Sequence, residues 1–278
     1  MGSVNKRVLI TGLNSLIGWN LFRKEEPGLE FFGTYRSPHP KLVNRSNCYR
    51  IDLDDSNDIE SILQKLNPNY IIHGRSICDL DICERFPELA ERINVEGTRK
   101  LIDKIKKLNR LEKFIFISTD HVFDGKAGNY SDKDIPEPKH VYGRTKRSAE
   151  ILVEQSGLPF IVIRPGLVLG DSLQGNKGPK DFLLNRLKKK KVTTLFEDEW
   201  RTPIQASELV DKVFMLMKSP REGVFHLSGS ESINRYNLGQ ILAKSKGFAG
   251  QLICSELRRN DLWAHIRPEK LTLLPSSI

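Results

Sequence analysis

The stretch Arg7-Val-Leu-Ile-Thr-Gly-Leu-Asn-Ser-Leu-Ile-Gly18 decides the fold of this chain. Its apolar beginning predicts a buried strand over residues 7–11, and residues 15–24 predict a helix. A glycine turn between a first strand and a first helix lets backbone amides approach a pyrophosphate at the positive end of the helix. An ordinary glycine turn is the alternative. On the first interpretation, the cofactor contacts come from the turn residues Gly12, Asn14, Ser15, Leu16, Ile17 and Gly18.

Ser15 stands where such a turn usually has its middle glycine. Its Cβ would crowd the phosphate at this position. Its hydroxyl could instead replace the lost contact or cap the helix.

Strands and helices alternate through the first two thirds of the chain. Short apolar runs predict strands over residues 30–35, 49–51, 69–72, 114–118 and 160–164. Helices are expected over residues 56–66, capped by Ser56 or Asn57, over residues 87–108, and around Tyr142. Near-continuous apolar strands separated by helices indicate a parallel sheet that is covered on both faces. We therefore expect an α/β fold with a Rossmann-like doubly wound parallel sheet, whose ligand lies at the carboxyl ends of the strands.

The pattern loosens after residue 164. Residues 170–180 are rich in Gly, Asn and Lys, which indicates a mobile loop. Helices are expected over residues 181–190, 207–218 and 236–246, and a strand over residues 223–227. We predict that residues 1–165 form a cofactor-binding Rossmann domain to which residues 203–226 return. Residues 166–202 and 227–278 are predicted to form a smaller C-terminal α/β lobe that binds the substrate.

Composition places the chain among ordinary globular proteins. Of its 278 residues, 38% are hydrophobic and 28% charged, and no stretch is long and apolar enough to predict a membrane span. The start of the chain leads directly into a strand, so no signal peptide is expected. Cys48, Cys78, Cys83 and Cys254 have no paired spacing, which predicts reduced thiols in a cytoplasmic protein and no metal site.

The net charge of +9 lies partly in two runs within predicted helices, Lys104 to Lys107 and Arg186 to Lys191. A solvated helix face is the simplest interpretation. A basic rim that attracts a phosphate-bearing substrate is the second. Nucleic-acid binding is disfavoured, because no helix-turn-helix, zinc finger or aromatic-basic platform is visible.

The end of the second predicted strand bears on the choice of cofactor. An acidic residue there would bind a ribose 2′-hydroxyl and favour NAD. The chain has Thr34-Tyr-Arg-Ser37 instead, and the guanidinium of Arg36 suits a 2′-phosphate. NADP(H) is therefore the expected cofactor, with a surface arginine as the alternative. Asp52, which follows the third strand, either accepts a hydrogen bond from the adenine amino group or caps a turn.

Tyr142 and Lys146 stand four residues apart in Val141-Tyr-Gly-Arg-Thr-Lys146. On a helix this spacing puts both side chains on one face. An ammonium beside a phenol favours the phenolate, so Lys146 is expected to lower the pKa of Tyr142 and make it a proton donor or acceptor near neutral pH. Chance matches to this short pattern are common. The polar end of the buried strand Phe114-Ile-Phe-Ile-Ser-Thr-Asp120 supports the catalytic interpretation.

These motifs together resemble the extended short-chain dehydrogenases/reductases. The chain is most similar to dTDP-4-dehydrorhamnose reductase and its relatives, which include the regulatory β subunit of methionine adenosyltransferase. The resemblance covers nearly the whole chain, in the family's order, through Thr11-Gly12 with Gly18, Ile51-Asp-Leu-Asp54, Asp81-Ile-Cys-Glu84, Asn94-Val-Glu-Gly-Thr98, Ser118-Thr-Asp-His-Val-Phe-Asp-Gly125, Tyr142-Gly-Arg-Thr-Lys146 and Arg201-Thr-Pro203.

The resemblance implies a role for each matching residue. Tyr142 would protonate a carbonyl oxygen as hydride arrives from the nicotinamide, and Thr119 would hydrogen-bond the same oxygen. Lys146 would hold the nicotinamide ribose, while Pro165 and Gly166 would present backbone to the nicotinamide. Asn94 would support the site from the predicted helix over residues 87–108. Further cofactor contacts are implied for Asp52, Leu53, Gly74, Arg75, Ser76 and Asn94, and substrate contacts for Asp120, His121, Val122 and Arg201.

Besides Ser15, two further positions bear on the resemblance. His121 stands where sugar-nucleotide 4,6-dehydratases carry a glutamate, which argues against a standard dehydratase. Histidine could do acid/base work there or be a hydrogen-bonded structural residue. His73-Gly-Arg-Ser76 replaces a small, alanine-rich segment, so Arg75 either reaches the cofactor or points elsewhere.

The leading hypothesis is NADPH-dependent reduction of a keto group on a nucleoside-diphosphate sugar, whose two phosphates would suit the lysine-rich rim. One alternative is a nucleotide-sugar epimerase or dehydratase of the same fold. The other is a non-catalytic, NADP-binding regulatory subunit, since the fold alone does not decide activity. The sugar, the nucleotide, the stereochemistry of the product and the formation of a homodimer are left open.

Overall fold

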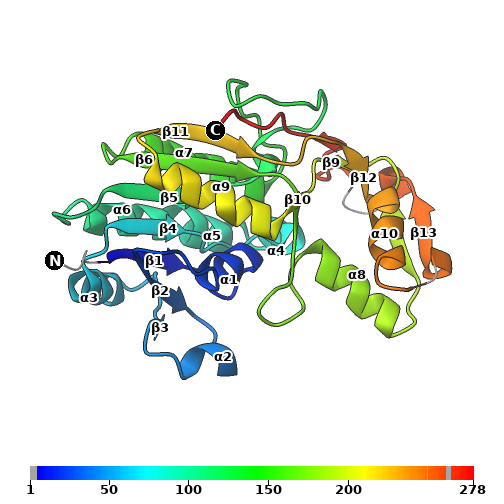
Figure 1. Ribbon diagram of the computed structural model, residues 1–278. Coiled ribbons are helices and arrows are strands. Elements are labelled where there is room, and N and C mark those ends of the chain that lie inside the picture. The colour runs from blue at the N-terminus through cyan, green and yellow to red at the C-terminus, as the bar shows by residue number, and fades with distance from the viewer. Residues whose placement is uncertain (1–4, 249, 261–263) are drawn as a thin grey trace.

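A seven-stranded parallel sheet forms the centre of the computed structural model, which describes residues 5–248, 250–260 and 264–278 (Figure 1). Its spatial order is β11-β6-β5-β4-β1-β2-β3. The order reverses between β1 and β4, and such a switch point is where doubly wound sheets bind ligands. The predicted Rossmann-like fold is confirmed. The strands are β1 (Lys6–Thr11), β2 (Leu29–Tyr35), β3 (Cys48–Arg50), β4 (Tyr70–His73), β5 (Lys113–Ile117), β6 (Phe160–Pro165) and β11 (Gly223–Leu227).

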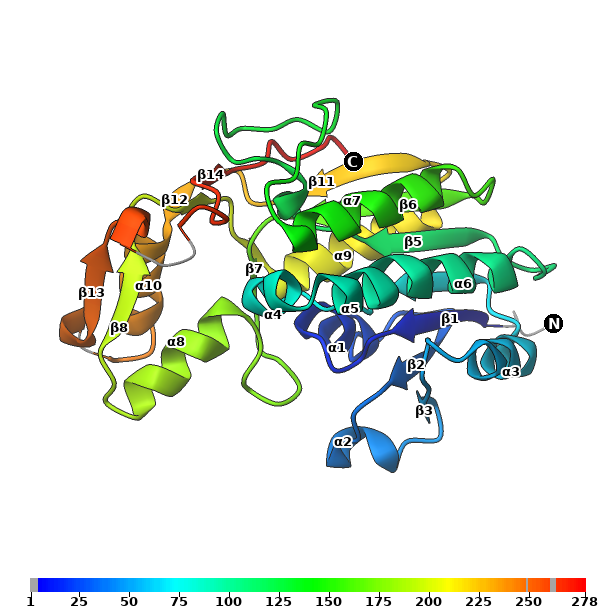
Figure 2. The same ribbon diagram turned by 180° about the vertical axis from the view of Figure 1, so that it is seen from behind.

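Helices cover both faces of this sheet (Figures 1 and 2). On one face lie α1 (Leu16–Phe22) and α9 (Ala206–Lys218); on the other lie α3 (Ser56–Leu66), α6 (Gly97–Ile105) and α7 (Val141–Glu154). Each helix buries an apolar stripe. In α9 the stripe is Leu209, Val213 and Met217, whose spacing of four residues keeps them on the side that faces the sheet.

The first turn brings two glycines into contact. Gly12 has a φ of +85°, a conformation that side chains rarely adopt. A Cβ on Gly18 would lie 2.4 Å from the carbonyl oxygen of Gly12, so α1 can begin this close to β1 only with glycine there. The predicted turn therefore requires glycine both at Gly12, for its backbone conformation, and at Gly18, for the close approach of α1.

A smaller lobe lies beyond the carboxyl ends of the strands (Figure 1). The two-stranded sheet β13-β8 packs with α8 and α10 around Leu183, Leu187, Leu195 and Ile253, and a second short sheet has the order β12-β9-β14. The elements of this region are β7 (Val168–Leu169), α8 (Gly178–Lys188), β8 (Thr193–Phe196), β9 (Trp200–Arg201), β10 (Ile204–Gln205), β12 (Ile233–Asn234), α10 (Arg235–Lys244), β13 (Ile253–Glu256) and β14 (Lys270–Leu271).

The end of the chain returns to the large sheet. The backbone N–H of Ser276 donates to the carbonyl oxygen of His226 in β11 at 3.0 Å, and the backbone N–H of Leu274 donates to Tyr130 at 2.8 Å. The sequence placed this segment in the smaller lobe. In the structure it lies along the edge strand β11 (Figure 1).

Several predicted boundaries are corrected by local packing. The single helix expected over residues 87–108 is α5 (Pro87–Glu91), a π-helical segment (Arg92–Glu96) and α6. The cap of α3 is Asp55, not Ser56 or Asn57, because its carboxylate accepts from the backbone N–H of Asn57. Helix α8 begins at Gly178, inside the predicted loop. The short helices α2 (Pro40–Val43) and α4 (Leu80–Arg85) were not predicted.

Among the described residues, no helix combines the length and the apolar character that crossing a membrane requires. Within the same residues, no group of three His, Cys, Asp or Glu side chains is arranged to hold a metal ion.

Candidate active site

Thr119, Tyr142 and Lys146 meet where β5 ends and α7 begins. Thr119 lies two residues beyond β5, and its Oγ1 accepts the backbone N–H of His121 at 3.2 Å, which starts a 3-10 turn (Asp120–Val122). Tyr142, the second residue of α7, lies beside Thr119. All three side chains are buried. The structure thus brings the three predicted catalytic residues to the carboxyl edge of the sheet.

The electrostatics of Tyr142 differ from the sequence-based expectation. Burial, followed by the nearby Cys78 thiol, raises the pKa of Tyr142 well above 10, although the neighbouring Thr119 hydroxyl opposes this shift. The predicted lowering of this pKa is therefore wrong for the protein alone, because burial removes the phenol from water and disfavours the charged phenolate. A phenol with a raised pKa stays protonated at neutral pH.

Two contacts hold the ammonium of Lys146 against strand β5. Its Nζ donates to the carbonyl oxygen of Ile117 at 2.7 Å and lies 4.0 Å from the centre of the Phe116 ring. Burial lowers the pKa of Lys146 to about 7, and the Glu150 carboxylate one turn further along α7 opposes the shift. Near physiological pH, Lys146 is therefore divided between the ammonium and the neutral amine.

Asn94 joins the loop after β4 to α7. Its Oδ1 accepts the backbone N–H of Ile77 at 2.8 Å, and its Nδ2 donates to the Ile77 carbonyl and to Thr145 Oγ1, both at 3.0 Å. Asn94 belongs to the π-helical segment, and such irregular turns often occur at functional sites. This position fits the supporting role that the resemblance implied.

The first turn fits a dinucleotide phosphate. A Cβ on Gly12 would meet the backbone N of Arg75 at 2.9 Å, so only glycine keeps this approach open. Ser15 caps α1, since its Oγ accepts the backbone N–H of Gly18 at 2.9 Å. Of the roles left open for Ser15, capping is the one that the structure shows. Asn14 donates to the carbonyl oxygen of Ser37 at 3.1 Å and so joins this turn to the loop after β2.

Arg75 points toward the end of β3. Its Nη2 lies 3.0 Å from Asp54 Oδ1 and 3.4 Å from Asp52 Oδ1, and its buried Nη1 has no hydrogen-bond partner among the described residues. A Cβ on Gly97 would lie 3.0 Å from this Nη1, so glycine makes room for the guanidinium. A buried Nη1 donor without a hydrogen-bond partner among the described residues fits a group with several acceptors, such as adenine.

The other predicted cofactor residues surround these contacts. Leu53 and Pro165 are buried, whereas Leu16, Ile17, Gly74 and Ser76 are partly exposed.

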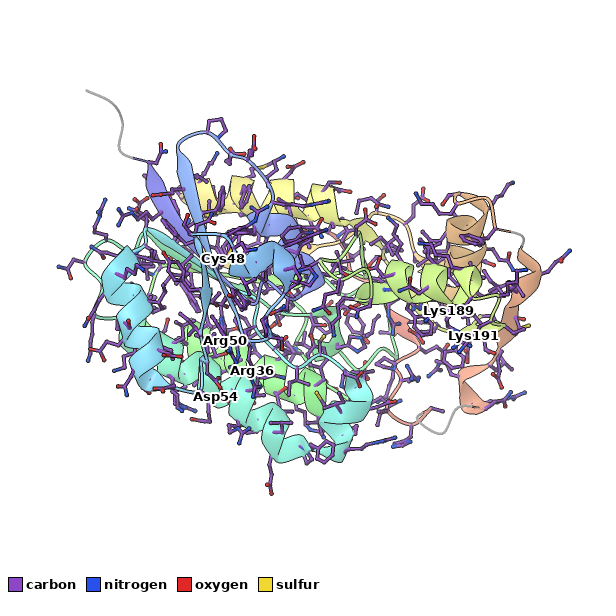
Figure 3. The ribbon with its side chains drawn as sticks, turned by 90° about the horizontal axis from the view of Figure 1, so that it is seen from below. Arg36, Cys48, Arg50, Asp54, Lys189 and Lys191 are labelled. Carbon is purple, nitrogen blue, oxygen red and sulfur yellow. The ribbon has the colours of Figure 1, made fainter. Side chains whose placement is uncertain are left out.

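Arg36 has a neighbour that the sequence analysis missed. Arg50 closes β3, and its Cα partner across the sheet is Tyr35, the residue before Arg36. Both arginines are exposed, and Figure 3 shows them close together at this end of the sheet. Two guanidinium groups therefore face solvent where the ribose 2′-position of a dinucleotide is expected.

A cleft of about 230 Å³ opens on the side of the smaller lobe. Three arginines supply its positive charge. Arg201 pairs with Glu199 at 2.9 Å, and Arg235 lies 3.8 Å from the same carboxylate oxygen. The lining residues are Leu80, His121, Leu167, Gly178, Pro179, Phe182, Glu199, Arg201, Arg235, Arg267 and Pro268.

The lysine run does not form the rim of this cleft. Gly178 and Phe182 lie at the beginning of α8 and line the cleft. Lys188 to Lys191 lie at the other end of this helix and beyond it. Figure 3 shows Lys189 and Lys191 far from Arg36 and Arg50. The basic groups that line the cleft are therefore arginines, not the lysines that the sequence suggested for a phosphate-binding rim.

The predicted substrate residues after Thr119 face different ways. Burial raises the pKa of Asp120 to about 6, although Arg201 opposes the shift, and Thr119 donates to its Oδ1 at 3.2 Å. The side chain of Val122 is fully buried with Phe123 and faces the core rather than the cleft. His121 lines the cleft.

His121 has a partner that sequence reasoning did not find. Its Nδ1 lies 2.8 Å from Nε2 of His140, which directly precedes α7. The position of His140 two residues before Tyr142 was the only signal in the sequence. Arg235 and Glu199 were missed as well, because Glu199 lies in the turn before β9 and Arg235 begins α10, far away in the sequence.

Comparison with known proteins agrees with this architecture. The family described as RmlD substrate binding domain matches residues 6–273. Methionine adenosyltransferase 2 subunit beta of Bos taurus is 27% identical, and the match covers 86% of this chain and 72% of that protein.

Two solved structures are also similar. A hypothetical dTDP-4-dehydrorhamnose reductase from Sulfolobus tokodaii has a TM-score of 0.81 and 28% identity, and the match covers 96% of this chain and 91% of that one. A dTDP-4-dehydrorhamnose reductase from Bacillus anthracis, solved in complex with NADP, has a TM-score of 0.82 and 20% identity, with 98% and 91% covered. Because the family model matches residues 6–273, nearly the whole length of this chain, the chain belongs to the RmlD substrate binding domain family.

Proposed function

We propose that this protein is an NADPH-dependent reductase of a keto group on a nucleoside-diphosphate sugar. The observation that carries the proposal is the buried cluster of Thr119, Tyr142 and Lys146, at the edge of the sheet where ligands bind. Membership of the RmlD substrate binding domain family supports the same assignment.

Tyr142 is protonated at neutral pH, which the proton donor of a ketone reduction requires. A phenol that stays protonated at neutral pH can give its proton to the carbonyl oxygen of a ketone. Thr119 would hydrogen-bond the same oxygen and orient it toward the phenol. Lys146 would bind the ribose next to the nicotinamide. The bound cofactor would supply the hydride.

The cofactor preference rests on the edge formed by β2 and β3. Arg36 and Arg50 offer two cations for a 2′-phosphate, and no acidic residue follows β2 to bind a 2′-hydroxyl. A structurally similar reductase was solved with NADP, which supports the same preference.

The substrate class rests on the arginine-lined cleft. Guanidinium groups recognise phosphate oxygens with paired hydrogen bonds, and Arg201, Arg235 and Arg267 outnumber the single Glu199. A diphosphate would complement this charge. The neighbouring apolar side chains Leu80 and Phe182 would suit the less polar parts of a nucleotide sugar.

A regulatory role is the second candidate, because methionine adenosyltransferase 2 subunit beta is among the relatives of this chain. The retention of Thr119, Tyr142 and Lys146 in one buried cluster favours catalysis. An epimerase or dehydratase would retain its cofactor through the cycle and would therefore not consume NADPH.

A panel of nucleotide-sugar ketones, followed by NADPH absorbance, tests the proposal. We expect NADPH to be consumed in a 1:1 ratio with one class of ketone. Conversion of a nucleotide sugar without net NADPH consumption would indicate an epimerase or dehydratase. Tight NADPH binding without turnover of any ketone would indicate the regulatory role.

A further inference from the structure

His140 is locked by the beginning of α7. The backbone N–H of Gly143 donates to His140 Nδ1 at 3.1 Å. A backbone N–H can only donate, so Nδ1 of His140 must carry a lone pair. Burial, followed by Arg144 and Arg201, lowers the pKa of His140 to about 4, so the ring is neutral at physiological pH. Its single proton is therefore on Nε2.

This tautomer fixes that of His121. Nε2 of His140 lies 2.8 Å from Nδ1 of His121, and because His140 holds the proton, it is the donor. Burial, together with His140 and the three cleft arginines, keeps the pKa of His121 well below 6.5. A neutral His121 whose Nδ1 accepts must carry its own proton on Nε2.

The protonated nitrogen of His121 faces the cleft. His140, which is 1% exposed, covers Nδ1, and the edge of the Tyr142 ring packs at a centroid distance of 5.9 Å. About 20% of the His121 side chain remains exposed, and the residue lines the cleft beside Arg201. Nε2 lies 4.0 Å from Asp120 Oδ1, which is too long for a hydrogen bond.

We propose that His121 is a specificity residue whose Nε2–H donates to an oxygen of the substrate beside Tyr142, and that His140 is the positioning residue that presents this proton. The inference rests on the proposed function and narrows its substrate class. A donor this close to the proton-donating phenol would select a keto sugar with a hydroxyl on a carbon next to the ketone. A deoxy analogue would leave the N–H unpaired, and polar sites reject such analogues strongly.

Two variants separate the parts of this arrangement. His121→Phe keeps a ring but removes both nitrogens. His140→Asn keeps the cap of α7, because an asparagine Oδ1 can accept the N–H of Gly143, but its side chain is too short to reach His121. His140→Ala removes the cap as well and serves as the control for a purely structural effect.

The first readout is the protonation of the imidazole nitrogens, measured by ¹⁵N NMR of the intact protein. We expect both His121 and His140 to be protonated on Nε2 only. In His140→Asn, His121 should show a mixture of both tautomers. Protonation of His121 on Nδ1 in the wild type would overturn the inference, whether or not the protein turns over a ketone.

The second readout is calorimetric binding of two nucleoside-diphosphate sugars, one with the neighbouring hydroxyl and one without it. We expect His121→Phe to weaken binding of the hydroxylated sugar by about 10-fold or more, the range of one buried hydrogen bond, and to leave the deoxy sugar unchanged. NADPH affinity should not change. The inference would be refuted if His121→Phe lost the same affinity for both sugars. It would also be refuted if the wild-type protein bound neither sugar. Normal discrimination without turnover would refute the proposed reductase activity alone.

Discussion

Glu150 ties the helix that carries Tyr142 to two strands of the sheet. Its carboxylate is fully buried and accepts hydrogen bonds from Arg164 Nε and Nη2 at 2.9 and 2.8 Å, from Ser118 Oγ at 2.5 Å and from Arg147 Nη1 at 3.0 Å. The Arg164 side chain is only 3% exposed. Replacing Glu150 by Gln keeps the shape of the side chain but leaves the Arg164 guanidinium buried without its anion.

Glu150→Gln should lower the free energy of unfolding, because it leaves the buried charge of Arg164 uncompensated. Breaking such a pair from one side destabilises a protein by about 3–5 kcal/mol. A typical free energy of unfolding is about 5–15 kcal/mol, so Glu150→Gln should remove about a fifth or more of it. At roughly 2 °C per kcal/mol for a chain of this size, Tm should fall by about 6–10 °C. Since Glu150 also raises the pKa of Lys146, this pKa should fall further below its ordinary value.

Urea unfolding followed by circular dichroism measures this effect in a double-mutant cycle of Glu150→Gln and Arg164→Met. The double variant should lose less stability than the two single variants together, by about 2 kcal/mol or more. Arg147→Met is the matched control: its side chain is 24% exposed, and its loss should cost about 0–1 kcal/mol. A cost below about 1 kcal/mol for Glu150→Gln, or strict additivity in the cycle, would refute this account of the buried pair.

Three further predictions concern the cofactor edge, acid stability and the first helix. Arg36→Ala should weaken NADPH binding by ~1–3 kcal/mol and leave NADH binding unchanged, as measured by calorimetry; equal losses would show that Arg36 does not bind the 2′-phosphate. Burial lowers the pKa of His226 from 6.5 to about 4, so its contribution to stability is present above pH 6.5 and is lost as the pH falls toward 4. His226→Gln should therefore reduce the loss of unfolding free energy between pH 7 and pH 4 by about 3 kcal/mol, and an unchanged pH dependence would contradict this. Ser15→Ala should cost about 1 kcal/mol by removing the cap of α1, whereas Ser15→Gly should cost only about a few tenths; equal costs in urea unfolding would show that the hydroxyl does not act as a cap.

The parts of the fold that the sequence predicts are those set by local patterns. The apolar runs that became β1, β4, β5 and β6 are buried on both faces, so their hydrophobicity alone identifies them. The spacing of Tyr142 and Lys146 likewise placed both on one face of α7, and the structure buries both. The two- to four-residue strands of the smaller lobe are too short to form a readable pattern.

The parts that the sequence does not predict depend on burial and on contacts between distant residues. Glu150 looks like an ordinary charge on a helix until Arg164, from the next strand, is placed against it. The partnership of His121 and His140 depends on the loop that brings β5 and α7 together. The spacing of Lys146 and Tyr142 predicts proximity but not dehydration, and dehydration decides the direction in which the pKa of Tyr142 moves.

The central claim is that Tyr142 is the proton donor of a reductase, and turnover of Tyr142→Phe tests it most directly. The substitution removes the phenol hydroxyl and keeps the ring. With NADPH and a keto nucleotide sugar, we predict that kcat falls by roughly 10²–10⁴-fold, the usual contribution of one general acid, while the affinity for NADPH stays unchanged. Lys146→Met, as the comparison variant, should lower both turnover and NADPH affinity. Unimpaired turnover in Tyr142→Phe would contradict the account.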